Sequence, residues 1–157
     1  MDRCIKMLQF EIATLEDAGL LAEVSAKAFN NDINYGAQKE QGPPGYDSAD
    51  WQKSMMSNRQ IMYYKILYDN SIIGGFLIFN KGFGYYELAR IFIDPLYQNQ
   101  GIGTATFDFI WQEFPEAKKW SLETPAWNQR TQHFYKKVGF NVKESNSEGI
   151  RFEKIVK

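Results

Sequence analysis

The 157 residues fit one domain, in which a single core buries roughly 68–70% of the surface that the unfolded chain exposes. A net charge of -1 and a pI of about 5.9 create no general field for nucleic acid or anionic membranes, so any anion site must be local. One cysteine, Cys4, and one histidine, His133, exclude an intrachain disulfide and a zinc site of several such ligands. Neither "MDRCIKMLQF" nor any other segment has the apolar run of a signal peptide or a membrane span, so we expect one cytoplasmic domain over residues 1–157.

The first part of the chain predicts a strand, a helix and a long loop. The run "LQFEIAT" alternates as a strand does, and Thr14 with Asp17 three residues later resembles a capping box that opens a helix through Ala28. Residues 30–50 are rich in turn residues and lack periodicity, which is typical of a lid or a binding loop. A short helix is expected near residues 49–57.

Three strand-like runs follow without an intervening helix. The runs "IMYYKILYD" and "SIIGGFLIFN" are joined at Asp69 and Asn70, and a glycine-containing turn at residues 81–84 leads into "YYELARIFID". Consecutive strands with short connections predict an antiparallel meander.

The last part of the chain alternates helices and strands. In "IGTATFDFIWQEF" the residues Ile102, Phe107 and Ile110 have the spacing of one helical face, and "KKWSLE" is a short strand. A helix follows and stops at Gly139, where glycine permits a left-handed cap, and two short strands complete the chain. The order β-α-α-β-β-β-α-β-α-β-β predicts an α/β (α+β) domain around a mostly antiparallel sheet.

The stretch "QNQGIG" at residues 98–103 lies between a strand and a helix, where backbone N–H groups can bind an anion. A P-loop is disfavoured because Thr104 and Ala105 follow Gly103 in place of a lysine and a hydroxyl residue. A Rossmann fingerprint finds its acid at Glu123, about 20 residues on, but it requires βαβ units and the preceding strands form a meander.

Two regions together resemble one known family. The segment "IFIDPLYQNQGIG" is similar to the acyl-CoA-binding motif of the GNAT family of N-acetyltransferases, and "NQRTQHFYKKVGF" carries the family's asparagine, its Phe-Tyr pair and its Gly-Phe pair at the expected intervals. The resemblance covers most of the chain. It implies a mixed sheet of six to seven strands flanked by about four helices, with a splay between strands 4 and 5.

The resemblance also implies that acetyl-CoA binds at this splay. Backbone N–H groups near residues 99–104 would receive the diphosphate at a helix N-terminus, and the amide-rich pantetheine arm would pair with exposed backbone at residues 91–93. Many relatives have Arg-Gly-Lys at positions 98–100, so this chain lacks two favourable charges. The predicted donor-binding residues are Ile91, Phe92, Ile93, Gln98, Asn99, Gln100, Gly101, Ile102, Gly103, Thr104, Asn128 and Tyr135.

Acyl transfer to an amine requires a proton donor for the leaving thiolate and an acceptor for the amine proton. Tyr135 matches the family's tyrosine acid, with a buried core aromatic as the alternative. Glu87 matches a carboxylate that several relatives use as a base, and strand alternation places it with Ala89 and Ile91 unless a bulge reverses its facing. An ion pair or a substrate contact is the alternative for Glu87. His133, two residues before Tyr135, points elsewhere on the helix.

The acceptor is predicted to be a primary amine of a small molecule or a peptide. Tyr35, Tyr46 and Asp47 in the loop of residues 30–50 are the candidate acceptor contacts, because aromatic rings and carboxylates bind cationic amines; Asp32 and Glu40 belong to the same mixture. A solvated loop is the alternative. No metal, nucleic acid or membrane is predicted as a partner, and a homodimer stays open.

Two other functions stay open at this stage. A non-catalytic CoA-binding sensor or partner module would retain the fold without turnover, and intact Tyr135 and Asn128 argue for the enzyme. A Rossmann-type nucleotide-binding domain is the third alternative.

Overall fold

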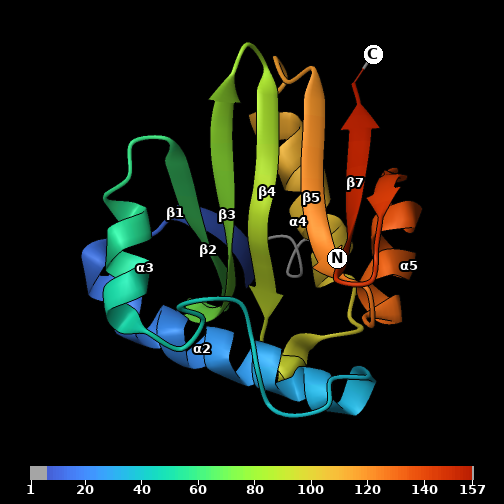
Figure 1. The fold of residues 1–157 in the computed structure, drawn as a ribbon. Helices are drawn as coiled ribbons and strands as arrows, with labels where there is room; N and C mark the ends of the chain where they lie inside the picture. The colour runs from blue at the N-terminus through green and yellow to red at the C-terminus, as the bar shows by residue number, and fades with distance from the viewer. Residues whose placement is uncertain (1–6, 157) are drawn as a thin grey trace.

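A sheet of seven strands in the order β1-β2-β3-β4-β5-β7-β6 carries helices on both faces (Figure 1). This computed structural model describes residues 7–156. The strands are β1 (Leu8–Ile12), β2 (Ile61–Tyr68), β3 (Ser71–Gly82), β4 (Tyr85–Ile93), β5 (Lys119–Pro125), β6 (Asn141–Ser145) and β7 (Gly149–Ile155). The helices are α2 (Ala18–Asn30), α3 (Ala49–Met56), α4 (Ile102–Glu113) and α5 (Gln129–Lys137), with short 3-10 helices η1 (Leu15–Asp17), η2 (Asn31–Tyr35) and η3 (Pro95–Tyr97). The predicted order of strands and α-helices is confirmed.

The structure bears on three features considered from the sequence, namely the cysteine, a membrane span and a metal site. Cys4 lies outside the described residues. Within residues 7–156, no helix combines the length and the apolar character that crossing a bilayer requires. The same residues contain no group of three or more His, Cys, Asp or Glu side chains arranged to hold a metal ion.

Turn residues explain the antiparallel meander of β2, β3 and β4. Asp69 and Asn70, between β2 and β3, have positive φ values of 51° and 66°, as a two-residue hairpin turn requires. Asparagine and aspartate tolerate this left-handed region better than most residues. The turn between β3 and β4 uses Gly82 and Gly84, with φ values of 90° and 81°. Local conformation therefore reverses the chain twice, and the three strands lie side by side.

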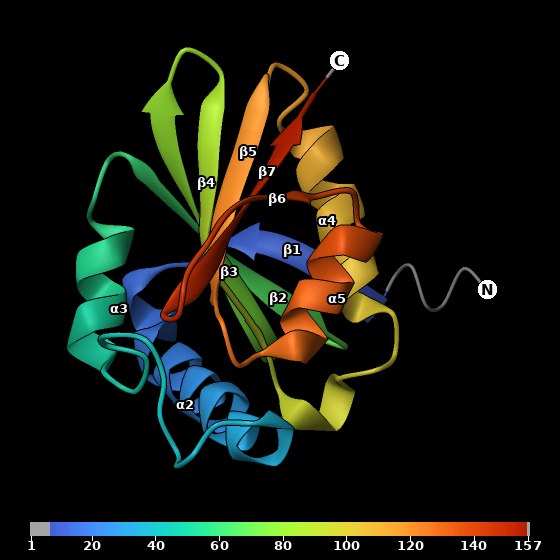
Figure 2. The same ribbon diagram turned by 45° about the vertical axis from the view of Figure 1, so that its right-hand side comes forward.

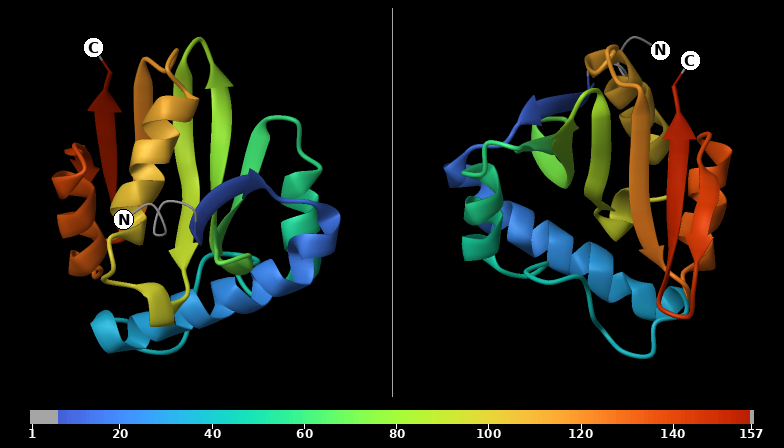
Figure 3. Two further views of the ribbon diagram at one scale, coloured as in Figure 1. Left: turned by 180° about the vertical axis from the view of Figure 1, so that it is seen from behind. Right: turned by 45° about the horizontal axis from the view of Figure 1, so that its top comes forward.

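Each face of the sheet has an apolar core of its own, and Figure 3 shows the two faces from further sides. The core under α2 and α3 contains Leu21, Val24, Ala28, Tyr63, Leu77 and Phe92. The larger core under α4 and α5 includes Phe76, Ile102, Phe107, Ile110, Trp120, Leu122, Tyr135, Phe140 and Phe152. The apolar face predicted for the helix after the glycines is thus the buried face of α4.

The sheet is open between β4 and β5. These parallel neighbours pair at three positions only, Tyr85 with Lys119, Tyr86 with Trp120 and Glu87 with Ser121. Beyond these pairs the strands separate toward their C-terminal ends (Figure 1). Figure 2 shows α4 and α5 on one side of the sheet and α2 and α3 on the other. The other neighbouring strands are antiparallel. The predicted splay is confirmed, and the Rossmann alternative is wrong because its repeated parallel βαβ units do not occur in the described sheet.

A bulge in β4 corrects the predicted facing of Glu87. The register with β3 pairs Leu77 with Arg90 but Ile78 with Leu88, so Ala89 is an extra residue. Glu87 therefore shares the face of Arg90, which is covered by α2 and α3, and not the face of Ile91. The expectation that Glu87, Ala89 and Ile91 face one way is wrong, because one extra residue inverts the alternation.

The core predicts a clear contrast between two leucines. Leu122 is 1% exposed and Leu96 is 79% exposed, so the same Leu→Ala change removes packing at one site only. Leu122→Ala should lower the free energy of unfolding by about 2–5 kcal/mol, and Leu96→Ala by less than about 0.5 kcal/mol. Urea denaturation followed by circular dichroism measures both. Equal losses in the two variants would contradict the assignment of this core.

Candidate active site

A cavity of about 720 Å³ lies where β4 and β5 separate. Its lining comes from residues 88–93 of β4, the loop from Tyr97 into α4, the end of β5, α5 and the loop around residues 41–43. This volume lies within the range of about 300–1,000 Å³ that is usual for small-molecule sites. The cavity therefore joins segments from all parts of the chain.

The glycine-rich loop of residues 98–104 forms one wall of this cavity. Asn99 and Gly101 have positive φ values of 62° and 80°, and α4 begins directly after them at Ile102. The first backbone bond of the helix runs from Ala105 N to Gly101 O at 3.0 Å, which leaves the preceding N–H groups without intrahelical partners. A Cβ at Gly103 would lie 2.9 Å from Cζ of Phe134, so a side chain here would displace the ring that packs α5 against α4.

Most of the predicted donor-binding residues meet at the cavity. Eleven positions line it: Ile91, Phe92, Ile93, Gln98, Asn99, Gly101, Ile102, Gly103, Thr104, Asn128 and Tyr135. Gln100 is the exception, because it is exposed and its side-chain amide donates to Leu96 O at 3.2 Å. The residues before and after Gln100 therefore line the cavity, whereas Gln100 itself points away from it.

Asn128 fixes the beginning of α5 against the end of β5. Its side-chain oxygen accepts a hydrogen bond from Thr131 N at 3.2 Å, and the residue is 3% exposed. The hydroxyls of Thr124 and Thr131 are 2.6 Å apart, which connects β5 to the same helical turn. Asn128 thus caps α5 and also lines the cavity.

Tyr135 is a buried aromatic residue that lines the cavity. It is 8% exposed and packs edge-on against Phe107 and Phe140. Within residues 7–156 no protein group is hydrogen-bonded to its hydroxyl. Burial, and next the negative charge of Asp32, raise the pKa of Tyr135 above its ordinary value. The hydroxyl therefore stays protonated at neutral pH and is available as a donor.

Glu87 lies outside the lining of the cavity. Its Oε1 is 3.6 Å from Nζ of Lys81, and the two side chains are 31% and 40% exposed, so this ion pair adds little stability. Through the bulge, Glu87 shares the strand face of Arg90 and Phe92, which both line the cavity. Its side chain lies one residue beyond the lining of the cavity along β4.

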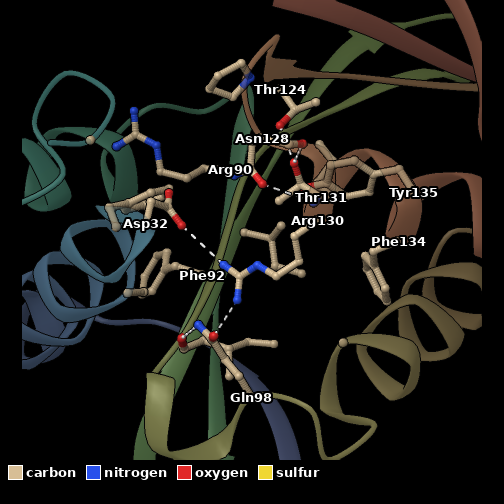
Figure 4. A pocket seen from close by; sticks show the side chains of 18 of the residues that line it. Asp32, Arg90, Phe92, Gln98, Thr124, Asn128, Arg130, Thr131, Phe134 and Tyr135 are labelled. Carbon is tan, nitrogen blue, oxygen red and sulfur yellow. Dashed lines mark hydrogen bonds and ion pairs between the residues drawn. The ribbon is translucent and has the colours of Figure 1, made fainter. Parts of the chain in front are cut away.

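Arg130 crosses the cavity and was not singled out by the sequence (Figure 4). Its Nη1 donates to Gln98 Oε1 at 2.7 Å, and its Nη2 donates to Asp32 Oδ1 at 3.2 Å. The Gln98 amide in turn donates to Ile93 O at 2.9 Å, and the guanidinium stacks 3.8 Å above the ring of Tyr35. Only the fold reveals this network, because Asp32 and Arg130 are 98 positions apart.

The loop of residues 30–50 contributes some of its residues to the cavity. Tyr35, Tyr46 and Asp47 do not line the cavity in the described chain; the ring of Tyr35 stacks on Arg130, and the Tyr46 hydroxyl donates to Asn30 Oδ1 at 2.8 Å. Residues of the same segment that do line it are Asp32, Gln41, Gly42 and Pro43. Of the residues in the predicted mixture, Asp32 lines the cavity, whereas Tyr35, Glu40, Tyr46 and Asp47 do not.

Arg90 is a second half-buried cation at the cavity. Its guanidinium stacks 4.0 Å above the ring of Trp51, and Nη2 donates to Pro44 O at 3.0 Å. Its Nη1 is buried without a partner in the described chain. Burial lowers the pKa of Arg90 to about 10, so the side chain stays charged at neutral pH. Arg90 holds the loop of residues 41–47 against β4.

Residues 27–140 match the family model described as Acetyltransferase (GNAT) family. The chain belongs to the GNAT family. One curated relative, "Uncharacterized protein YrkN" from Bacillus subtilis (strain 168), is 31% identical to this GNAT chain over 111 residues, which are 69% of this chain and 59% of that protein. The match thus spans little more than half of that relative's length.

Solved GNAT structures share the fold of this chain. The PaiA N-acetyltransferase from Thermoplasma acidophilum in complex with coenzyme A is 19% identical, with a TM-score of 0.80 over 95% of this chain and 99% of that one. The ribosomal-protein-S18-alanine N-acetyltransferase from Escherichia coli is 16% identical, with a TM-score of 0.74 over 95% of this chain and 94% of that one. At such identities the likeness shows a common GNAT fold.

The cap at Asn128 predicts a measurable stability loss. Asn128→Ala should lower the free energy of unfolding by about 1–2 kcal/mol, because Thr131 N loses its acceptor in a buried position. Asn128→Asp keeps an acceptor oxygen and should recover part of the loss. Gln129→Ala, at an exposed neighbouring position, is the matched control. Equal stability of Asn128→Ala and the wild type in urea denaturation would show that this cap contributes nothing.

Proposed function

We propose that the protein is an acetyl-CoA-dependent N-acetyltransferase that acts on a primary amine of a small molecule or a peptide. The observation that carries this proposal is the coincidence of three features at one cavity. These features are the unpaired edge of β4 beyond Glu87, a helix N-terminus preceded by a glycine loop, and the buried hydroxyl of Tyr135. Family membership supports the assignment, and one solved relative of the same fold is a complex with coenzyme A.

The residues of the cavity fit the chemistry of this donor. Free N–H groups at the start of α4 suit a diphosphate, since the helix dipole favours negative charge and the positive φ of Gly101 turns the backbone toward it. The open edge of β4 suits the amides of pantetheine, which hydrogen-bond as an added strand does. When bound, acetyl-CoA supplies a thioester whose acetyl carbon bonds to the amine nitrogen while the carbon–sulfur bond breaks.

The protein's own task is to stabilise the leaving sulfur and to accept the amine proton. Tyr135 donates a hydrogen bond from its hydroxyl to the departing sulfur, and its raised pKa keeps this hydroxyl protonated at neutral pH. An alkylamine with a pKa of about 10.4 is unprotonated in roughly one molecule in a few thousand at pH 7, so its proton needs an acceptor. Glu87 is the proposed acceptor, reached through water because its side chain lies outside the cavity lining.

A non-catalytic CoA-binding module is the second candidate. The same cavity would serve it, and the burial of Tyr135 among aromatic rings is compatible with a purely structural tyrosine. Turnover of an amine separates the two candidates, because only an enzyme consumes an acceptor. The name of one solved relative specifies spermidine and that of another specifies an alanine of a ribosomal protein, so the fold accommodates different amines.

Donor binding should stabilise the folded protein. A ligand that binds only the native state, at 100 times its dissociation constant, adds about 2.7 kcal/mol, which raises the melting temperature by several degrees in a chain of this size. We expect acetyl-CoA and CoA to produce this shift, and NAD and ATP to produce much less. Differential scanning fluorimetry measures it. An unchanged melting temperature in millimolar CoA would refute the donor assignment.

Substitutions of Tyr135 and Glu87 should lower turnover in different ways. With an amine found by screening for thiol release, Tyr135→Phe should lower kcat by about 10²-fold at unchanged CoA affinity, because it deletes one unbonded hydroxyl. Glu87→Gln should lower turnover by an amount that shrinks as pH rises toward the pKa of the amine, since free amine then becomes abundant.

Matched substitutions control for this pair of variants. Tyr85→Phe and Glu113→Gln make the same chemical changes at exposed positions outside the cavity and should retain full turnover. A Tyr135→Phe protein at full rate would remove the acid role. A Glu87→Gln defect that is constant with pH would assign Glu87 to substrate positioning.

A further inference from the structure

Asp32 is a carboxylate of the cavity that is already neutralised. The residue is 9% exposed, and Arg130 is the side chain that hydrogen-bonds its carboxylate in the described chain. Its negative charge raises the pKa of Tyr135, so the carboxylate acts on the part of the cavity where the acyl group is to be transferred. Because the guanidinium compensates the charge of Asp32 through Oδ1, a cationic amine binds this carboxylate more tightly when Arg130 is not its partner.

The proposed donor loop, residues 98–104, lacks a positive charge of its own. Residues 98–104 contain no cationic side chain, although a diphosphate is the proposed ligand of their backbone N–H groups. Arg130 is hydrogen-bonded to Gln98, the first residue of this loop, and 30% of its side chain is exposed. One guanidinium therefore lies between a carboxylate that needs a cation in the free protein and a loop that needs one when an anion binds.

We infer that Arg130 exchanges partners during the reaction cycle, leaving Asp32 for the diphosphate of the donor and so freeing Asp32 for the ammonium group of the acceptor. This inference rests on the proposed donor site. It makes Arg130 a donor-binding residue and Asp32 an acceptor-binding residue, and it predicts that the acceptor is a cationic amine that binds after the donor.

Charge balance is the physical reason for the exchange. The Arg130–Asp32 pair is partly buried, with 30% and 13% of the two side chains exposed, so separating it leaves charge uncompensated and is unfavourable. Another anion offsets this loss for Arg130. The diphosphate is such an anion, and the ammonium group then replaces the guanidinium at Asp32. By linkage, donor binding must raise the affinity for the cationic amine by the same factor by which the amine raises affinity for the donor.

A structural role for the ion pair predicts the opposite sign. If Asp32 only held Arg130 in position beside Gln98, then Asp32→Asn would weaken CoA binding, because the guanidinium would lose its anchor. If Asp32 competes for Arg130, then Asp32→Asn removes a competitor and tightens CoA binding. Asparagine has nearly the size of aspartate, so the variant changes charge without opening a void.

Isothermal titration calorimetry with CoA distinguishes the two roles. Arg130→Gln should weaken CoA binding by about 10- to 100-fold, the range for losing hydrogen bonds to a charged group. Asp32→Asn should tighten it severalfold. Lys136→Gln removes the same charge from an exposed neighbour that does not line the cavity, and it should bind CoA within about twofold of the wild type. Arg130→Lys, which keeps the charge but not the planar fork, should fall between Arg130→Gln and the wild type.

Each outcome decides the inference. Wild-type affinity in Arg130→Gln, weaker CoA binding in Asp32→Asn, or equal losses in Arg130→Gln and Lys136→Gln would overturn it while leaving the acetyltransferase assignment intact. If the wild-type protein does not bind CoA, both proposals fall. Circular dichroism reports whether each variant is folded, and Asp32→Asn alone gives the deciding sign if Arg130→Gln does not fold.

Discussion

The early end of pairing between β4 and β5 is the constraint on which the site depends. After Glu87 and Ser121 the two strands share no register, and the edge of β4 that faces β5 lacks a strand partner. An unpaired edge is costly to bury and prone to bind another extended chain. Here the cavity borders it, so the backbone that the fold leaves unpaired is available to a ligand with amides of its own.

The walls of the opening must be held apart, and both sides of the sheet contribute. Aromatic packing of Phe107, Tyr135 and Phe140 fixes α4 and α5 on one face. On the other face, Arg90 holds α3 against β4 by stacking on Trp51, and it holds the loop before α3 by its hydrogen bond to Pro44 O. Arg130 spans the gap between these rigid parts through a polar network, and polar contacts can exchange partners where packed rings cannot. Rigid walls with a polar bridge are suited to admitting a charged ligand.

Local patterns in the sequence determined most of the architecture. Turn residues at Asp69 and Asn70 and the glycine at Gly139 set chain reversals and a helix end, because positive φ restricts which residues can occupy such positions. The loop from Gln98 to Thr104 was predictable for the same reason, since its geometry comes from adjacent residues. Asn128 was predictable as a cap because a cap acts over three residues.

Tertiary structure alone decided which side chains meet across the cavity. The bulge at Ala89 inverted the facing of Glu87, and alternation cannot reveal a bulge because one extra residue leaves no local signal in an apolar strand. Asp32 and Arg130 meet although 98 positions separate them, because η2, which follows α2, and the first turn of α5 lie at the same end of the opened sheet. The sequence by itself thus determined the elements and the glycine loop of residues 98–104, which depend on neighbouring residues, whereas the fold decided the charge pairing, which depends on contacts between distant ones.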